Sequence, residues 1–140
     1  AAQMAADPSV RARYNVVSVV TAGSPTATIA PSDVPVLAYE NSGDIVAGLD
    51  GNATRGDNVT TVMFRDYEAT CHADDAVPCS HSAPLYVDEI RSTLDAAHTS
   101  SDPGLGALAA AEARRTQALG LTHNTQTTVH HYQTRRITQG

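Results

Sequence analysis

The sequence lacks lysine and tryptophan altogether, and it holds one phenylalanine and two cysteines among its 140 residues. All nine basic residues are therefore arginines, and they are scattered along a chain whose formal net charge is −6. Phosphate groups of nucleic acids are bound by a concentrated basic face, so we expect no nucleic-acid partner. With so few aromatic rings, the chain also offers no obvious platform on which a sugar could stack.

Long apolar runs are also absent. No run approaches the roughly 20 residues that a membrane-spanning helix needs, so we expect no membrane span, and no signal peptide is present at residue 1. The chain opens instead on an alanine-rich run of helix formers without a capping residue, which Asp7-Pro8 ends. We interpret this run as a helix cut off at its start, so the missing signal carries no weight. The alternative is an ordinary N-terminal helix that is uncapped.

The two cysteines, Cys71 and Cys79, stand eight positions apart in a polar loop. A local disulfide would close this loop and implies an oxidising compartment, which predicts a secreted or cell-surface protein. The alternative is two free or metal-binding cysteines, but a second ligand pair at a recognised spacing is missing. The neighbouring His72, Asp74 and Asp75 are interpreted as a solvated loop surface. We therefore expect no metal and no cofactor.

Three strand-like runs rich in valine, Val16–Ala22, Val34–Tyr39 and Val59–Phe64, are joined by turn-rich links. Apolar residues at helical spacing predict a helix over Pro84–Ala97, and an alanine-rich run predicts another over Leu108–Leu119. The segment between these two helices, rich in Ser, Asp, Pro and Gly, is expected to separate them. Strands followed by helices in this way predict an α/β fold.

Chain length limits how much of such a fold can be present. A complete α/β sheet domain of this kind usually needs a chain of roughly 200–250 residues, whereas this chain has 140. The run Val16–Ala22 is apolar on both faces apart from Ser18 and Thr21, which predicts cover on both sides and pairing on both edges. We therefore expect a missing N-terminal half or a partner chain to protect the sheet edge.

Each strand-like run leads into a loop that carries chemically active residue types. The first leads into Gly23-Ser24-Pro25, the second into a loop with Asp44, and the third into a long loop that reaches His81. An acid after one strand and a histidine after the next is the order in which α/β-hydrolases present the last two members of a Ser-Asp-His triad. The nucleophile itself is absent, because the chain contains no Gly-x-Ser-x-Gly.

These residues carry a resemblance. The stretch Val16–Leu94 resembles the C-terminal half of α/β-hydrolase lipases and esterases, particularly class 3 lipases, which have a strand ending in Gly-x-Pro, then Asn-x-x-Asp-x-Val, then a His before the last helix. The matching elements are Gly23-Ser24-Pro25, Asn41-Ser42-Gly43-Asp44-Ile45-Val46, and His81 with Tyr86. Cutinase-like esterases are similar through Gly43-Asp44-x-Val46, although Ala47 stands where they often place a cysteine.

The resemblance implies a fold and a division of the chain. The fold is the C-terminal half of a mostly parallel α/β-hydrolase sheet with flanking helices, incomplete without an upstream half. Residues 1–98 would be the C-terminal part of the hydrolase domain. Residues 99–140 would be a helix plus an extended C-terminal arm, in which Thr125–Thr138 alternates like an edge strand.

The resemblance also implies a carboxylic ester hydrolase acting on an ester or lipid-like small molecule. Asp44 would orient a histidine, and His81 would be the general base toward a serine that lies upstream of residue 1. Ser24 is rejected as the nucleophile because it lacks the elbow glycine two residues later and is followed by Pro25, which has no backbone N–H for an oxyanion hole.

Alternatives remain for each assignment. Asp44 follows a glycine and could be an ordinary turn residue, in which case Glu40 and Asp50 are the alternative acids. His72 is the next candidate for the base. For the whole chain, the alternative is a non-catalytic, hydrolase-derived interaction or structural module that has lost its nucleophile, with residues 100–140 serving assembly.

Overall fold

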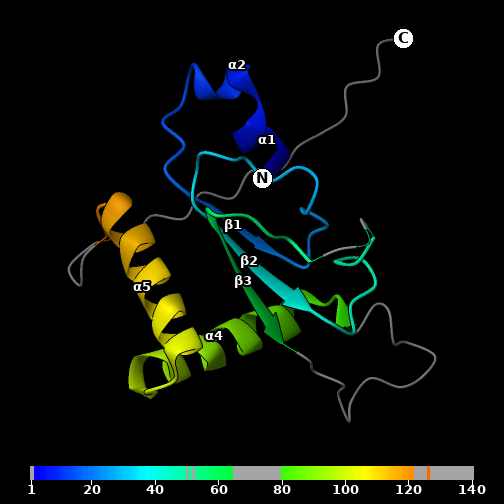
Figure 1. The fold of residues 1–140 in the computed structure, drawn as a ribbon, viewed down its shortest axis with the longest axis vertical. Helices are drawn as coiled ribbons and strands as arrows, with labels where there is room; N and C mark the ends of the chain where they lie inside the picture. Colours follow the sequence, from blue (N-terminus) through cyan, green and yellow to red (C-terminus); the bar gives the residue numbers. More distant parts are fainter. Residues whose placement is uncertain (1, 50, 52, 65–79, 122–125, 127–140) are drawn as a thin grey trace.

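The computed structural model describes residues 2–49, 51, 53–64, 80–121 and 126. A single parallel sheet is flanked by helices, which is a partial α/β arrangement (Figure 1). Its strands are β1 (Val19–Ala22), β2 (Val36–Asn41) and β3 (Val59–Phe64), in the order β1-β2-β3. The helices are α1 (Ala2–Ala6), α2 (Pro8–Arg11), α4 (Ala83–Thr99) and α5 (Pro103–Ala118).

The central strand β2 is buried along its whole length. It pairs with β1 from the register Val19↔Val36 and with β3 from Val36↔Val59, so the three valines lie side by side across the sheet. Successive residues of a strand point to opposite faces, which gives β2 a role in both halves of the core. Because all three strands run in the same direction, the loops that follow them emerge at one edge of the sheet.

Each face of the sheet carries its own hydrophobic cluster. On one face, Ala2 and Ala5 of α1 pack with Val19 and Val36. On the other face, Leu37 and Tyr39 pack with side chains from α4 and α5, including Tyr86, Ala97 and Leu108. The alanine-rich helix α1 therefore packs on this face of the sheet, since its small side chains allow close approach to β1.

Strand β1 is only partly covered within the described residues. It alternates between buried and exposed residues, and Val20 is 42% exposed. The predicted cover on both sides and pairing on both edges, which an upstream half or a partner chain would supply, stays a prediction. Within the same described ranges, β1 pairs with β2 alone. An apolar strand residue is thus left facing solvent beside an unpaired strand edge.

Helix limits also differ from the expected ones. The helix predicted over Pro84–Ala97 is confirmed and runs slightly further at both ends. The helix predicted from Leu108 begins five residues earlier, because Asp102 caps it and accepts the backbone N–H groups of Gly104 and Leu105 at 2.8 and 3.0 Å. A short helix that the sequence pattern does not predict, α2, follows α1 and is capped by Asp7.

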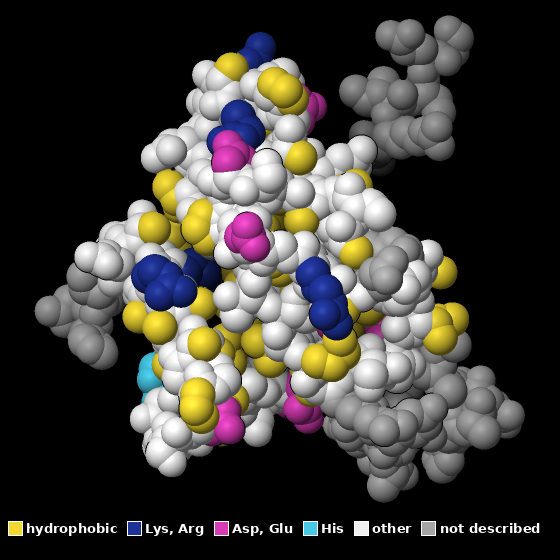
Figure 2. Space-filling model, in the orientation of Figure 1, with side chains coloured by type: hydrophobic (Ala, Val, Ile, Leu, Met, Phe, Trp, Pro, Cys, Tyr) yellow, Lys and Arg dark blue, Asp and Glu magenta, His cyan; other side chains and the backbone are white. Residues whose placement is uncertain are grey.

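Several sequence predictions concern residues outside the described ranges. They include the Cys71–Cys79 disulfide, the alternative residues Asp50 and His72, and the arm Thr125–Thr138, so these stay predictions. Among the helices that are described, none is long and apolar enough to cross a membrane. On the face drawn in Figure 2, the basic side chains lie in separate places rather than in one stripe.

Candidate functional site

The loops after β1 and β2 meet the start of α4 at the carboxyl edge of the sheet, and there the structure brings Asp44 and His81 together. Oδ2 of Asp44 lies 2.7 Å from Nδ1 of His81, although 37 positions separate the residues in the sequence. The carboxylate is fully shielded from solvent, whereas the imidazole side chain is 42% exposed. The pair therefore has a buried acid and an accessible ring.

A tight turn after β2 fixes the position of Asp44. Oδ1 of Asn41 accepts the N–H of Gly43 at 2.9 Å, and the N–H of Asp44 donates to the carbonyl of Asn41 at 3.0 Å. Oδ1 of Asp44 then accepts the N–H of Val46 at 2.9 Å. Asp44 is thus a turn residue through Oδ1 and the partner of His81 through Oδ2, so the two interpretations of this aspartate are compatible.

His81 lies just before α4, and the first turn of that helix supplies a second contact to the same carboxylate. The hydroxyl of Tyr86 donates to Oδ2 of Asp44 at 2.8 Å and accepts the backbone N–H of Asn41 at 3.2 Å. Asn41 also reaches the loop before α4, since its Nδ2 donates to the carbonyl of Ser80 at 3.3 Å. These bonds tie α4 to the end of β2 and so set where His81 stands relative to Asp44.

Burial and the bond to Asp44 raise the pKa of the Tyr86 hydroxyl far above its usual range, so it stays protonated and acts as a donor to the carboxylate. Its ring packs edge-on against Phe64 of β3, with the centroids 5.2 Å apart. The sequence pattern places Tyr86 in a motif with His81 but indicates no role for its hydroxyl.

Gly23 makes this close approach possible. It has a φ of +61°, and a Cβ at this position would lie 2.9 Å from Cε2 and Cζ of Tyr86 and 3.0 Å from Oδ2 of Asp44. Its N–H donates to the carbonyl of Tyr39 at 3.0 Å, which fixes the loop over the end of β2. Position 23 therefore requires glycine both for its backbone conformation and for space.

We expect Gly23→Ala to destabilise the fold more than Gly120→Ala. Gly120 has a nearly equal φ of +66° but nothing within 4 Å of an added Cβ. The loss of unfolding free energy in Gly120→Ala should therefore come from backbone strain alone, about 1 kcal/mol. At position 23, overpacking against Tyr86 and Asp44 should add roughly 1–3 kcal/mol. Urea unfolding of both variants measures the difference, and equal losses would contradict the packing argument.

The alternative acid Glu40 has a different environment. It is 4% exposed, and its Oε1 accepts the backbone N–H of Thr54 at 3.0 Å. Thr54 in turn shares a hydroxyl–hydroxyl bond of 2.6 Å with Thr26. Because neighbouring residues of a strand point to opposite faces, Glu40 projects from the face opposite to that of Asn41, whose backbone N–H meets Tyr86. The carboxylate of Glu40 therefore anchors the loop that contains Thr54. Asp44, and not Glu40, is the acid that lies against His81.

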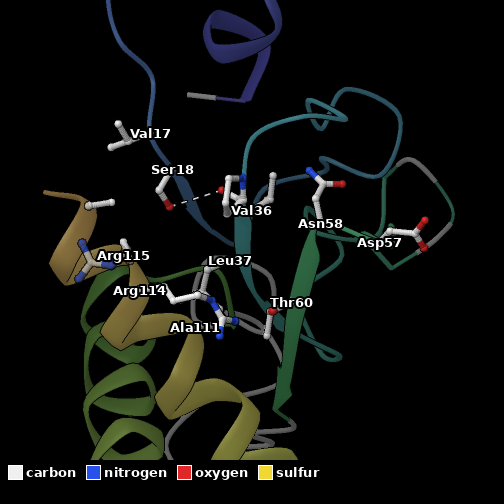
Figure 3. Close-up of a pocket in the computed structure, with 12 residues that line it drawn as sticks. Val17, Ser18, Val36, Leu37, Asp57, Asn58, Thr60, Ala111, Arg114 and Arg115 are labelled. Atoms are coloured by element: carbon white, nitrogen blue, oxygen red, sulfur yellow. Dashed lines mark hydrogen bonds between the residues drawn. The ribbon is translucent and has the colours of Figure 1, made fainter.

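Figure 3 shows a cavity of about 400 Å³ elsewhere, between α5 and the amino-terminal ends of the strands. It is lined in part by Leu37, Asn58, Thr60 and Arg114. Since Asp44 follows the carboxyl end of β2, this cavity lies at the other end of the sheet. A smaller hollow of about 230 Å³ includes Asp44 in its lining and lies at the carboxyl edge.

No metal site emerges from the described part of the chain, where no group of three or more His, Cys, Asp and Glu side chains could hold an ion. Ser24 adjoins the site through Gly23, but within the described ranges it forms no hydrogen bond with His81. Comparisons with protein-family models, with curated proteins and with solved structures give no match for this chain.

Proposed function

We propose that this chain is the acid- and base-bearing part of a serine ester hydrolase of the esterase or lipase type. The observation that carries the proposal is the 2.7 Å contact between Oδ2 of Asp44 and Nδ1 of His81 at the carboxyl edge of a parallel sheet. Open α/β sheets bind their ligands at this edge. A buried carboxylate on Nδ1 fixes the tautomer whose Nε2 can accept a proton.

The chemistry assigns each atom a role. A serine Oγ would lose its proton to Nε2 of His81 and attack the ester carbonyl, and the imidazolium would be stabilised by Asp44. His81 would return the proton to the departing alkoxide as the C–O bond breaks, leaving an acyl-enzyme. Water, deprotonated by the same nitrogen, would then release the acid and restore the serine.

The serine is proposed to lie in a segment that precedes Ala1 and forms the strand next to β1. Two observations support this placement. The outer edge of β1 has no partner strand among the described residues, and Val20 is 42% exposed beside it. An exposed parallel edge of this kind is normally covered by a further strand. The substrate would be an ester or lipid-like small molecule held between the two parts.

The test compares residues 1–140 alone with the same chain extended upstream. We expect no measurable hydrolysis of p-nitrophenyl acetate or butyrate by the 140-residue chain, because it lacks the nucleophile. Activity should appear when the upstream half is supplied, either covalently or as a second chain. Robust hydrolysis by the 140-residue chain alone, or none by the extended protein, would overturn the proposal.

A further inference from the structure

The structure assigns Tyr86 as a positioning residue that sets the basicity of His81 through Asp44, an inference that rests on the proposed function of this pair. The hydroxyl of Tyr86 and Nδ1 of His81 meet the same oxygen, Oδ2 of Asp44, at 2.8 and 2.7 Å. The two donors therefore share one carboxylate oxygen, and strengthening one contact weakens the other.

The hydroxyl is oriented for this role. It accepts the backbone N–H of Asn41 at 3.2 Å, which leaves its only proton directed to Asp44. Accepting that N–H also polarises the O–H bond, so the hydroxyl becomes a better donor. Tyr86 is 4% exposed, so water does not compete for the hydrogen bond between its hydroxyl and Asp44.

Among the described residues, two carboxylates act on the Tyr86 hydroxyl. They are Asp44, whose Oδ1 also accepts the N–H of Val46, and Glu40. The ring centroids of His81 and Tyr86 are 6.4 Å apart and the rings are nearly perpendicular, so they do not stack face to face. The two side chains are linked by their hydrogen bonds to Oδ2 of Asp44. Removing the Tyr86 hydroxyl should leave more of the negative charge of Asp44 to hold a proton on His81.

The test follows the ring resonances of His81 by NMR as the pH is changed, with the signal assigned by its loss in His81→Gln. In Tyr86→Phe, we expect the titration midpoint of His81 to move to higher pH by roughly half a unit to one unit. Tyr39→Phe is the matched control. Tyr39 packs in the same cluster and is 2% exposed, but it has no contact with Asp44 among the described residues, so it should leave the midpoint in place.

A second variant separates the effect of the Tyr86 hydrogen bond from that of a folding defect. Replacing Tyr86 by 3-fluorotyrosine retains the hydroxyl and makes it a stronger donor, so the midpoint should move to lower pH, opposite to Tyr86→Phe. An unchanged midpoint in both variants, or equal shifts in Tyr86→Phe and Tyr39→Phe, would overturn the inference. The titration requires no nucleophile, so its result is independent of whether the extended protein hydrolyses esters.

Where the extended protein is active, a kinetic readout is added. Tyr86→Phe should move the acid limb of the kcat/KM profile to higher pH in step with the His81 midpoint, because the unprotonated ring is the base. At pH values above the midpoint, kcat and KM should each change by less than about threefold, because the hydroxyl alters the protonation of His81 and makes no contact with the substrate. Equal changes in kcat and KM without movement of the acid limb would indicate a purely structural effect.

Discussion

His81→Ala should abolish ester hydrolysis by the extended protein, with a loss in kcat of about 10⁴–10⁶-fold. The imidazole lies against a buried carboxylate and is also accessible, since its Nδ1 is 2.7 Å from Oδ2 of Asp44 and its side chain is 42% exposed. Without the ring, a serine hydroxyl would have no base to accept its proton.

The matched control for this variant is His98→Ala. His98 lies in the last turn of α4, the helix that follows His81, and the proposed mechanism does not use it. It should retain activity within about twofold. Both variants are assayed with p-nitrophenyl butyrate after circular dichroism shows an intact fold. Full activity in His81→Ala would remove this histidine from the mechanism.

Asp44→Asn should lower kcat by about four orders of magnitude. An amide retains the shape of the side chain, and its oxygen can still accept the N–H of Val46, which preserves the turn after β2. The amide nitrogen would then face Nδ1 of His81 and the hydroxyl of Tyr86, so it would favour the wrong tautomer of the histidine. The expected loss thus arises from the pairing with His81 and not from unfolding.

Asp57→Asn provides the control for removal of a carboxylate. Asp57 lines the cavity near the amino-terminal ends of the strands, at the opposite end of the sheet from Asp44. It should leave kcat within about twofold. Steady-state kinetics of the two variants measure the contrast. A loss below tenfold in Asp44→Asn would point to Glu40 or another acid as the orienting group.

How far the sequence predicts the fold depends on what determines each boundary. Strand β3 is predicted with its observed limits, Val59–Phe64, because turn residues bound its apolar run. Strand β1 begins at Val19 instead of Val16, since pairing starts where its neighbour does, after Pro35, which has no N–H for the ladder. The sequence predicts the start of α5 too late, because the Ser, Asp, Pro and Gly residues before Leu108 indicate a break, whereas Pro103 suits the first turn of a helix.

The sequence also predicts only part of the candidate site. The juxtaposition of Asp44 and His81 could be predicted from the sequence, because parallel strands deliver the loops that follow them to one edge. The contact of Tyr86 with Asp44 could not, because it depends on how α4 is rotated over the sheet and on the missing Cβ of Gly23. Such contacts between distant segments leave no periodic signal in the sequence.

The most direct test of the central claim is to locate the nucleophile. The extended protein is treated with a fluorophosphonate, which phosphonylates an activated serine, and the labelled peptide is identified by mass spectrometry. We predict a label on one serine upstream of Ala1, within a Gly-x-Ser-x-Gly, and its loss in His81→Ala. A label on Ser24 or any other serine of residues 1–140, or no label on the folded extended protein, would contradict the claim that this chain supplies the acid and base to a serine outside it.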